Sequence, residues 1–153
     1  MVERTKTNPT AARPRVDHQV VGAAGEFLTA GMLFKRGYQV SVTYGNAKAI
    51  DLFVYNPQTR RTFKVQVKSQ HRKNCFPAQP KAIEPDSIWV FVRLNGPSDP
   101  EEFFVVPGAT ILANIPRYFG SSFRDPEHPS SFPAVNYGPL KEHQNNWGVF
   151  DVP

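Results

Sequence analysis

Cysteine is nearly absent from this sequence, and histidine is sparse and scattered. Cys75 is the only cysteine, which excludes an internal disulfide and any zinc site built from several thiolates. The four histidines show no pair at a metal-ligand spacing such as i and i+4. A structural zinc site is therefore not expected, and a lone thiol fits a reducing compartment such as the cytoplasm.

Long hydrophobic runs are also missing. No window reaches the roughly 18 apolar residues that a membrane-spanning helix requires. The chain begins MVERTKTNPTAARPR, which is polar and lacks the apolar segment of a secretory signal. We therefore expect a soluble, cytoplasmic protein with no membrane partner.

Acidic residues are missing from one long segment. Residues 1–82 hold 14 of the 18 Lys and Arg residues but only 4 of the 13 acidic residues. Residues 83–153 hold the other 4 basic residues and the other 9 acidic residues. Between Leu52 and Ile83 there is no acid, and the cations there are Arg60, Arg61, Lys64, Lys68, Arg72, Lys73 and Lys81. A positive field on one part of a small domain favours a nucleic-acid partner. Two alternatives stay open: a solvated basic face without a ligand, and an acidic C-terminal half that contacts another protein, as an inhibitor would.

The length and the pattern of the chain predict its organisation. The 153 residues suit one domain over 16–153, preceded by a flexible basic arm over 1–15. Residues 16–36 have helical periodicity, with an apolar stripe through Val20, Phe27 and Phe34 that we expect to face the core. Glu26 lies beside this stripe among small residues, so the helix can approach a sheet closely.

Strands follow the helix. Alternating or apolar segments predict strands over 38–43, 49–55, 62–69, 87–94 and 102–106, with a short helix over 108–115 and a loop over 116–139. The segments 49–55 and 62–69 are close enough to form a hairpin. The fold class expected is therefore α/β, with a mixed central sheet flanked by helices.

Polar side chains of this hairpin converge on one face. Successive side chains of a strand point to opposite faces, so pairing the apolar faces brings Asp51, Gln66 and Lys68 together. An ionisable residue between Ile50 and Leu52 is costly unless it is paired or bound to a cation. Carboxylate and amide oxygens suit Mg²⁺, and a lysine can neutralise the charge that develops on a phosphate. The alternatives are that Asp51 caps the preceding turn and that Gln66 and Lys68 are solvated strand residues.

These residues resemble the motifs of a known family. The helix GAAGEFLTAGMLFKRGY, then AIDLFVY, then FKVQVKS is similar to the PD-(D/E)XK nucleases, especially the branch of Holliday-junction resolvases and restriction-like endonucleases. The match covers Val20–Gln70, about a third of the chain. It departs from the pattern in two places, because Ile50 stands where the proline is usual and Gln66 where the acid is usual.

The resemblance implies a restriction-endonuclease-like core of α-β-β-β-α-β type and a set of site residues. Asp51, Gln66 and the Val67 carbonyl would hold Mg²⁺, for which Mn²⁺ would substitute, Glu26 would assist, and Lys68 would act on the water or the transition state. The implied function is a metal-dependent endonuclease that hydrolyses phosphodiester bonds in DNA, with RNA left open as a substrate. The alternative is an inactive nucleic-acid-binding module of the same fold. Such enzymes commonly act as dimers, so a homodimer is an open alternative.

The remaining cations of the basic segment are predicted to contact phosphates rather than to catalyse. Contacts of this kind come from Lys and Arg side chains and position a protein on nucleic acid. The predicted contact residues are Arg60, Arg61, Lys64, Arg72, Lys73 and Lys81.

Overall fold

The computed structural model describes residues 17–44, 50–71, 74–120 and 133–153. Its centre is a five-stranded mixed sheet in the order β1-β2-β3-β5-β6. The strands are β1 (Gln39–Val42), β2 (Leu52–Asn56), β3 (Arg61–Gln70), β5 (Ser87–Arg93) and β6 (Glu102–Pro107). Only β3 and β5 run parallel, and the other neighbours are antiparallel. The predicted α/β class, with a mixed central sheet flanked by helices, is confirmed.

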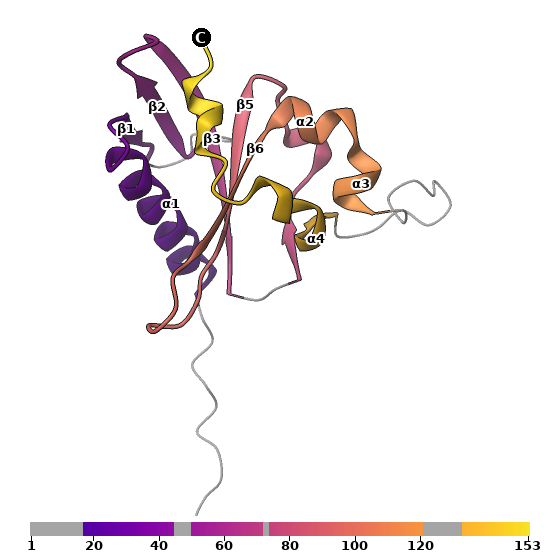
Figure 1. Ribbon diagram of the computed structural model, residues 1–153. Coiled ribbons are helices and arrows are strands. Elements are labelled where there is room, and N and C mark those ends of the chain that lie inside the picture. The colour runs from indigo at the N-terminus through magenta and orange to yellow at the C-terminus, as the bar shows by residue number, and fades with distance from the viewer. Residues whose placement is uncertain (1–16, 45–49, 72–73, 121–132) are drawn as a thin grey trace, which may run out of the picture.

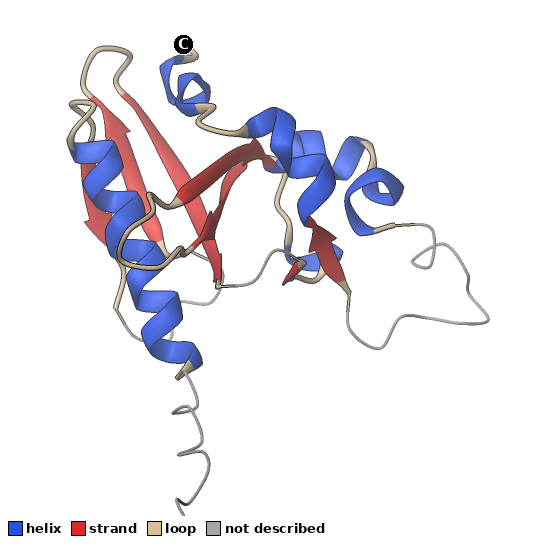
Figure 2. Ribbon diagram, turned by 60° about the horizontal axis from the view of Figure 1, so that its bottom comes forward, coloured by secondary structure: helices blue, strands red, loops and turns tan. Residues whose placement is uncertain are grey.

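One long helix covers one face of this sheet (Figures 1 and 2). Helix α1 (His18–Phe34) begins at Asp17, whose side chain accepts a 2.9 Å hydrogen bond from the Gln19 N–H and so caps the first turn. The core on this face includes Leu33, Val54, Val65 and Val90, closed by the C-terminal Phe150. The sheet alternates as predicted, so these apolar side chains and the polar ones lie on opposite faces.

The predicted apolar stripe of α1 is wrong in its orientation. Val20, Phe27 and Phe34 are 62%, 54% and 55% exposed. The helix instead buries Val21, Gly25, Thr29, Ala30 and Leu33. The physical reason is close packing, since a small-residue face allows the helix axis to approach the sheet more closely than a face of phenylalanines would.

Shorter elements cover the opposite face. They are α2 (Gly108–Ala113), α3 (Ile115–Phe119), α4 (Tyr137–Leu140) and a two-stranded sheet of β4 (Cys75–Pro77) with β7 (Ala134–Asn136). Phe76, Trp89, Phe91 and Ile111 belong to the core on this side. The 3-10 segments are η1 (Pro80–Ala82), η3 (Lys141–His143) and η4 (Trp147–Asp151). The segment predicted as loop over 116–139 therefore holds most of α3, all of β7 and the start of α4.

The connection between β3 and β5 departs from the expected core. In the described residues of this crossover, β4 and the one-turn η1 take the place of an α-helix. Three prolines, Pro77, Pro80 and Pro85, lie in this segment, and proline disfavours a continuous helix. The α-β-β-β-α-β arrangement is therefore incomplete at its second helix.

No helix in the described ranges is long and apolar enough to span a membrane. The predicted arm over 1–15 lies outside the described residues.

Candidate nuclease-like site at the free edge of β3

The candidate site forms where β2 stops short of β3. The register pairs Leu52 with Val65 and Asn56 with Arg61, so the part of β3 from Gln66 to Gln70 has no partner in β2. Asp51 immediately precedes β2 and lies beside this free edge. Its N–H donates to the Val65 carbonyl at 2.9 Å, and its carbonyl accepts from the Thr43 N–H at 2.9 Å. The backbone that carries the carboxylate is therefore held between β1 and β3.

The Asp51 carboxylate contacts the two residues that the sequence predicts. Its Oδ2 accepts a hydrogen bond from Gln66 Nε2 at 2.7 Å and another from the Val67 N–H at 2.7 Å. The N–H and C=O of one strand residue point to the same neighbouring strand, so the Val67 carbonyl also faces this edge. Asp51 and Gln66 thus lie on a common face, as the alternation of side chains predicts.

Glu26 reaches the same site from α1. The helix can come this close because Gly25 packs directly on β3, where an added Cβ would lie 1.7 Å from Ser69 Oγ. Burial raises the pKa of the Glu26 carboxyl, and the negative charge of Asp51 raises it further. The two carboxylates are therefore close enough to repel each other.

The pKa of Asp51 depends on effects of opposite sign. Burial raises the pKa of Asp51, while the hydrogen bond from the Val67 N–H and the positive charge of Lys68 lower it, and the net direction is upward. Two partly desolvated carboxylates with one nearby ammonium form a site whose negative charge is not fully compensated. Within the described ranges, no three or more His, Cys, Asp or Glu gather as a metal site, so any cation would also need Gln66 and backbone oxygens.

The residues predicted to contact phosphates differ in how available their charges are near this site. Lys81 is exposed on η1, next to Ala82, which lines a cleft shared with Lys68. Lys64 forms ion pairs with Glu84 at 2.5 Å and with Asp86 at 3.0 Å, so its charge is already compensated.

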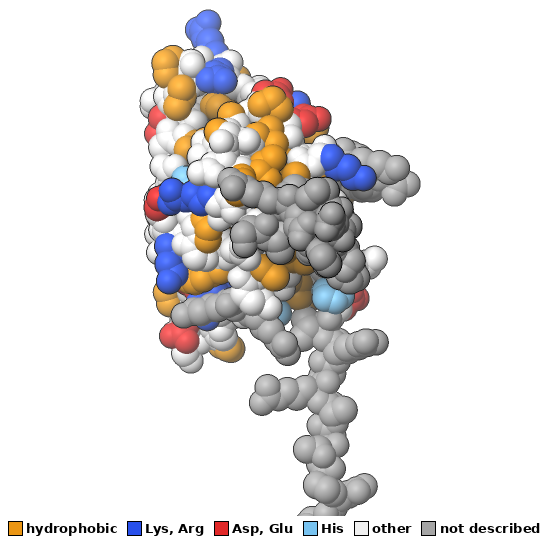
Figure 3. All heavy atoms as spheres, turned by 90° about the vertical axis from the view of Figure 1, so that its right-hand side faces the viewer, with side chains coloured by type: hydrophobic (Ala, Val, Ile, Leu, Met, Phe, Trp, Pro, Cys, Tyr) orange, Lys and Arg blue, Asp and Glu red, His pale blue; other side chains and the backbone are white. Residues whose placement is uncertain are grey.

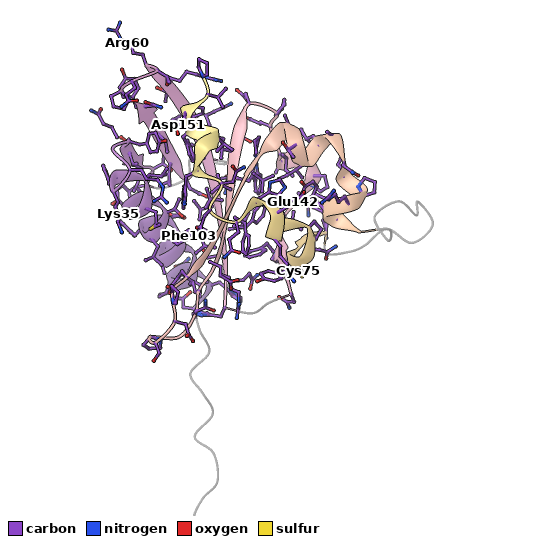
Figure 4. The ribbon with its side chains drawn as sticks, viewed as in Figure 1. Lys35, Arg60, Cys75, Phe103, Glu142 and Asp151 are labelled. Atoms are coloured by element: carbon purple, nitrogen blue, oxygen red, sulfur yellow. The ribbon has the colours of Figure 1, made fainter. Side chains whose placement is uncertain are left out.

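The two arginines of the hairpin lie far from the carboxylates. Arg60 is at the tip of the β2–β3 hairpin, at the opposite end of the molecule from Cys75 (Figure 4). Arg61 Nη1 donates to the Pro153 carbonyl at 2.9 Å, and its guanidinium lies 5.0 Å from the Phe63 ring centroid. At about 3.3 Å per strand residue, Arg61 is about 23 Å along β3 from Lys68. Arg72 and Lys73 fall outside the described residues.

No sequence pattern predicts the cleft that lies beside the site. A cavity of about 560 Å³ opens on the sheet face opposite α1, and its lining includes Gln66, Lys68 and Trp89. This side of the molecule carries clusters of hydrophobic side chains, with Lys and Arg mostly toward its margins (Figure 3). The cleft depends on how β4, β7 and η1 stand against β3 and β5, and these elements come from distant parts of the sequence.

Comparison with solved structures finds a remote similarity in fold. The chain matches no protein-family model, and no curated protein matches it. Among solved structures, the bacterial homing endonuclease I-Ssp6803I is similar to it, with a TM-score of 0.49 and 18% identity. The alignment covers 63% of this chain and 70% of that chain. A similarity of this degree concerns the arrangement of helices and strands, and nothing about activity follows from it.

Proposed function

We propose that this protein is a metal-dependent endonuclease that hydrolyses phosphodiester bonds in DNA. The observation that carries the proposal is the meeting of Glu26 and Asp51, from separate elements, beside Gln66 and Lys68. Burying two repelling carboxylates costs stability, and a divalent cation between them would offset that cost. The order of these residues along the chain also resembles the motifs of the PD-(D/E)XK nucleases.

The donor atoms at this edge fit Mg²⁺, and Mn²⁺ would substitute for it. Asp51 and Glu26 would contribute carboxylate oxygens, and Val67 and Gln66 would contribute carbonyl oxygens, a set that hard cations prefer. Gln66 donates its amide N–H to Asp51, so its carbonyl oxygen would face the cation after the amide group rotates. A bound ion would polarise the phosphate and lower the pKa of a coordinated water.

The chain's own residues have separate roles in this proposal. Glu26, which reaches the site from α1, would accept a proton from the attacking water. The Lys68 ammonium, whose charge acts on Asp51, would neutralise negative charge that develops on the phosphate. Lys81 would hold a flanking phosphate. Arg60 and Arg61 would contact only a duplex that extends along the hairpin, because Arg61 lies about 23 Å from Lys68, about two-thirds of a DNA helical turn.

Calorimetry and cleavage assays together test the proposal. Wild type should take up Mn²⁺ and cut DNA in the presence of Mg²⁺. Asp51→Asn should lose both properties, while Lys68→Ala should keep metal uptake and lose cleavage, because the ammonium is not a ligand. Asp99→Asn is the matched control, since this residue is exposed and has no role in the proposed site. If wild type shows no Mg²⁺-dependent cleavage of duplex, branched or single-stranded DNA, the proposed endonuclease activity is refuted.

A second candidate is a DNA-binding module that does not cut. It is favoured by the Gln66 amide, which satisfies the Asp51 carboxylate without any cation and would be a neutral, weaker ligand than the usual acid. This candidate predicts DNA binding that is the same in EDTA and in Mg²⁺, with no Mn²⁺ uptake that depends on Asp51.

A further inference from the structure

The cleft beside the proposed site has apolar walls and a polar rim. It is lined by β3, by Trp89 of β5, by the two-stranded sheet and by η1; the lining residues include Pro77, Ala78, Gln79, Ala82, Pro133 and Ala134. Trp89 is 3% exposed and its Nε1 donates to Ser87 Oγ at 3.1 Å, so the indole is fixed as part of the floor. The volume of about 560 Å³ lies within the range of small-molecule sites, which combine apolar walls with a few polar groups.

The cleft and the carboxylate site share two side chains. Gln66 hydrogen-bonds to Asp51 and also lines the cleft, and Lys68 acts on Asp51 and lines the cleft as well. A phosphate held beside Lys68 would therefore place its attached nucleoside at the mouth of the cleft. The occupant that matches both features is a flat, weakly polar ring attached to an anion.

We infer that the cleft takes the base of an unpaired nucleotide next to the phosphodiester bond that is cut. Bases that leave the stack are held between aromatic and apolar side chains, with polar groups at the edge of the ring. A base that remains paired in a duplex cannot enter a cleft enclosed on several sides by protein. The substrate class that follows is DNA with a bulged, mismatched or branched nucleotide. This inference rests on the proposed function, because the latter places the phosphate at Lys68.

Binding measured without metal tests the cleft separately from cleavage. Fluorescence anisotropy in EDTA would compare three DNA probes of one sequence: a matched duplex, a duplex with one bulged thymidine, and the same bulge with an abasic sugar in place of the thymidine. The two bulged probes bend alike and differ only in the base. Wild type should bind the bulged thymidine at least about fivefold more tightly than the abasic probe, the effect of one stacked base.

Two variants connect this preference to the cleft. Ala82→Phe should fill the cleft and remove the preference while leaving affinity for the matched duplex unchanged, because Ala82 is exposed at the cleft wall. Ala113→Phe adds the same ring at an exposed position of α2 that does not line the cleft, and it should keep the preference. Gln79→Glu provides a second test that leaves the packing unchanged, and it should weaken the preference because a base that enters the cleft would desolvate the added carboxylate.

Equal affinity of wild type for the thymidine and abasic bulges would overturn the inference even if the protein cuts DNA. If Ala82→Phe and Gln79→Glu both fold and still prefer the bulged thymidine over the abasic bulge, the cleft is not the site that binds the base. Conversely, a protein that shows the preference but never cuts would refute the proposed hydrolysis and leave the base-binding cleft intact.

Discussion

The contact between Gly25 and β3 permits a sharp test of how the site is assembled. A methyl group at Gly25 would lie 1.7 Å from Ser69 Oγ and 2.8 Å from Ser69 Cβ, so either the helix or the strand must move. Overpacking of this kind costs about 1–3 kcal/mol. Replacing a helical glycine by alanine returns about 0.8–1.0 kcal/mol through helix propensity. We therefore expect Gly25→Ala to lower the free energy of unfolding by about 1–2 kcal/mol.

Gly22 provides the matched control on the same helix. An added Cβ there meets nothing within 4 Å, so Gly22→Ala should raise the free energy of unfolding by about 0.5–1 kcal/mol through propensity alone. Urea denaturation would measure both effects, provided that the dependence of the unfolding free energy on urea concentration is the same in both variants. For a chain of this size, each 1 kcal/mol corresponds to about 2–4 °C in Tm.

A second substitution checks the cause. Ser69→Gly in the Gly25→Ala background removes both atoms of the clash, and within the described residues Ser69 Oγ has no hydrogen-bond partner that would be lost. Most of the lost stability should return. Gly25→Ala alone should also weaken Mn²⁺ uptake, because it moves the helix that carries Glu26. Equal stability changes in Gly22→Ala and Gly25→Ala would refute the close packing of α1 on β3.

Three further predictions concern charge and hydrogen bonding. Because burial raises the pKa of Asp51, the folded protein binds protons more readily than the unfolded chain, and the stability of the metal-free protein should fall as pH rises above a carboxyl group's ordinary range. Asp51→Asn should make the unfolding free energy, measured by urea denaturation at several pH values, fall less with pH. It should also stabilise the metal-free protein at pH 7 by about 0.5–1 kcal/mol, a small gain because the site is partly solvated. A pH dependence equal to that of wild type would contradict the conclusion that the Asp51 carboxylate is desolvated. Lys81→Ala should reduce the salt dependence of DNA binding by about one unit of log–log slope, whereas Lys64→Ala, whose charge is paired, should leave the slope unchanged. Tyr38→Phe should cost about 1–2 kcal/mol in urea denaturation, because the Tyr38 hydroxyl donates a 2.5 Å hydrogen bond to Asp151. Burial and this contact raise the pKa of Tyr38 to about 12, so absorbance titration of wild type should show a tyrosine that ionises near pH 12 and is missing from the variant.

The local structure around the site could be predicted from residue patterns along the chain. Strand alternation is a property of backbone geometry, so the pattern around Gln66 was sufficient to place it on the same face as Lys68 and Asp51. The positions of β1, β3, β5 and β6 followed from apolar segments bounded by turn residues for the same reason. The cap that Asp17 provides for α1 is equally local, because capping depends on neighbours in sequence.

The buried face of α1 and the opening of the site depend on contacts between elements that are distant in sequence. The exposed Phe27 and Phe34 are more hydrophobic than the buried Gly25, Thr29 and Ala30, but transfer free energy does not record how closely two backbones can approach. That depends on the small face through Gly25 meeting β3. In the same way, Lys64 became an ion-pair partner rather than a free phosphate contact because the parallel pairing of β3 with β5 brings the distant acids of residues 84 and 86 beside it. The cleft beside Lys68 arises from elements far apart in the chain, and no local pattern records a space between them.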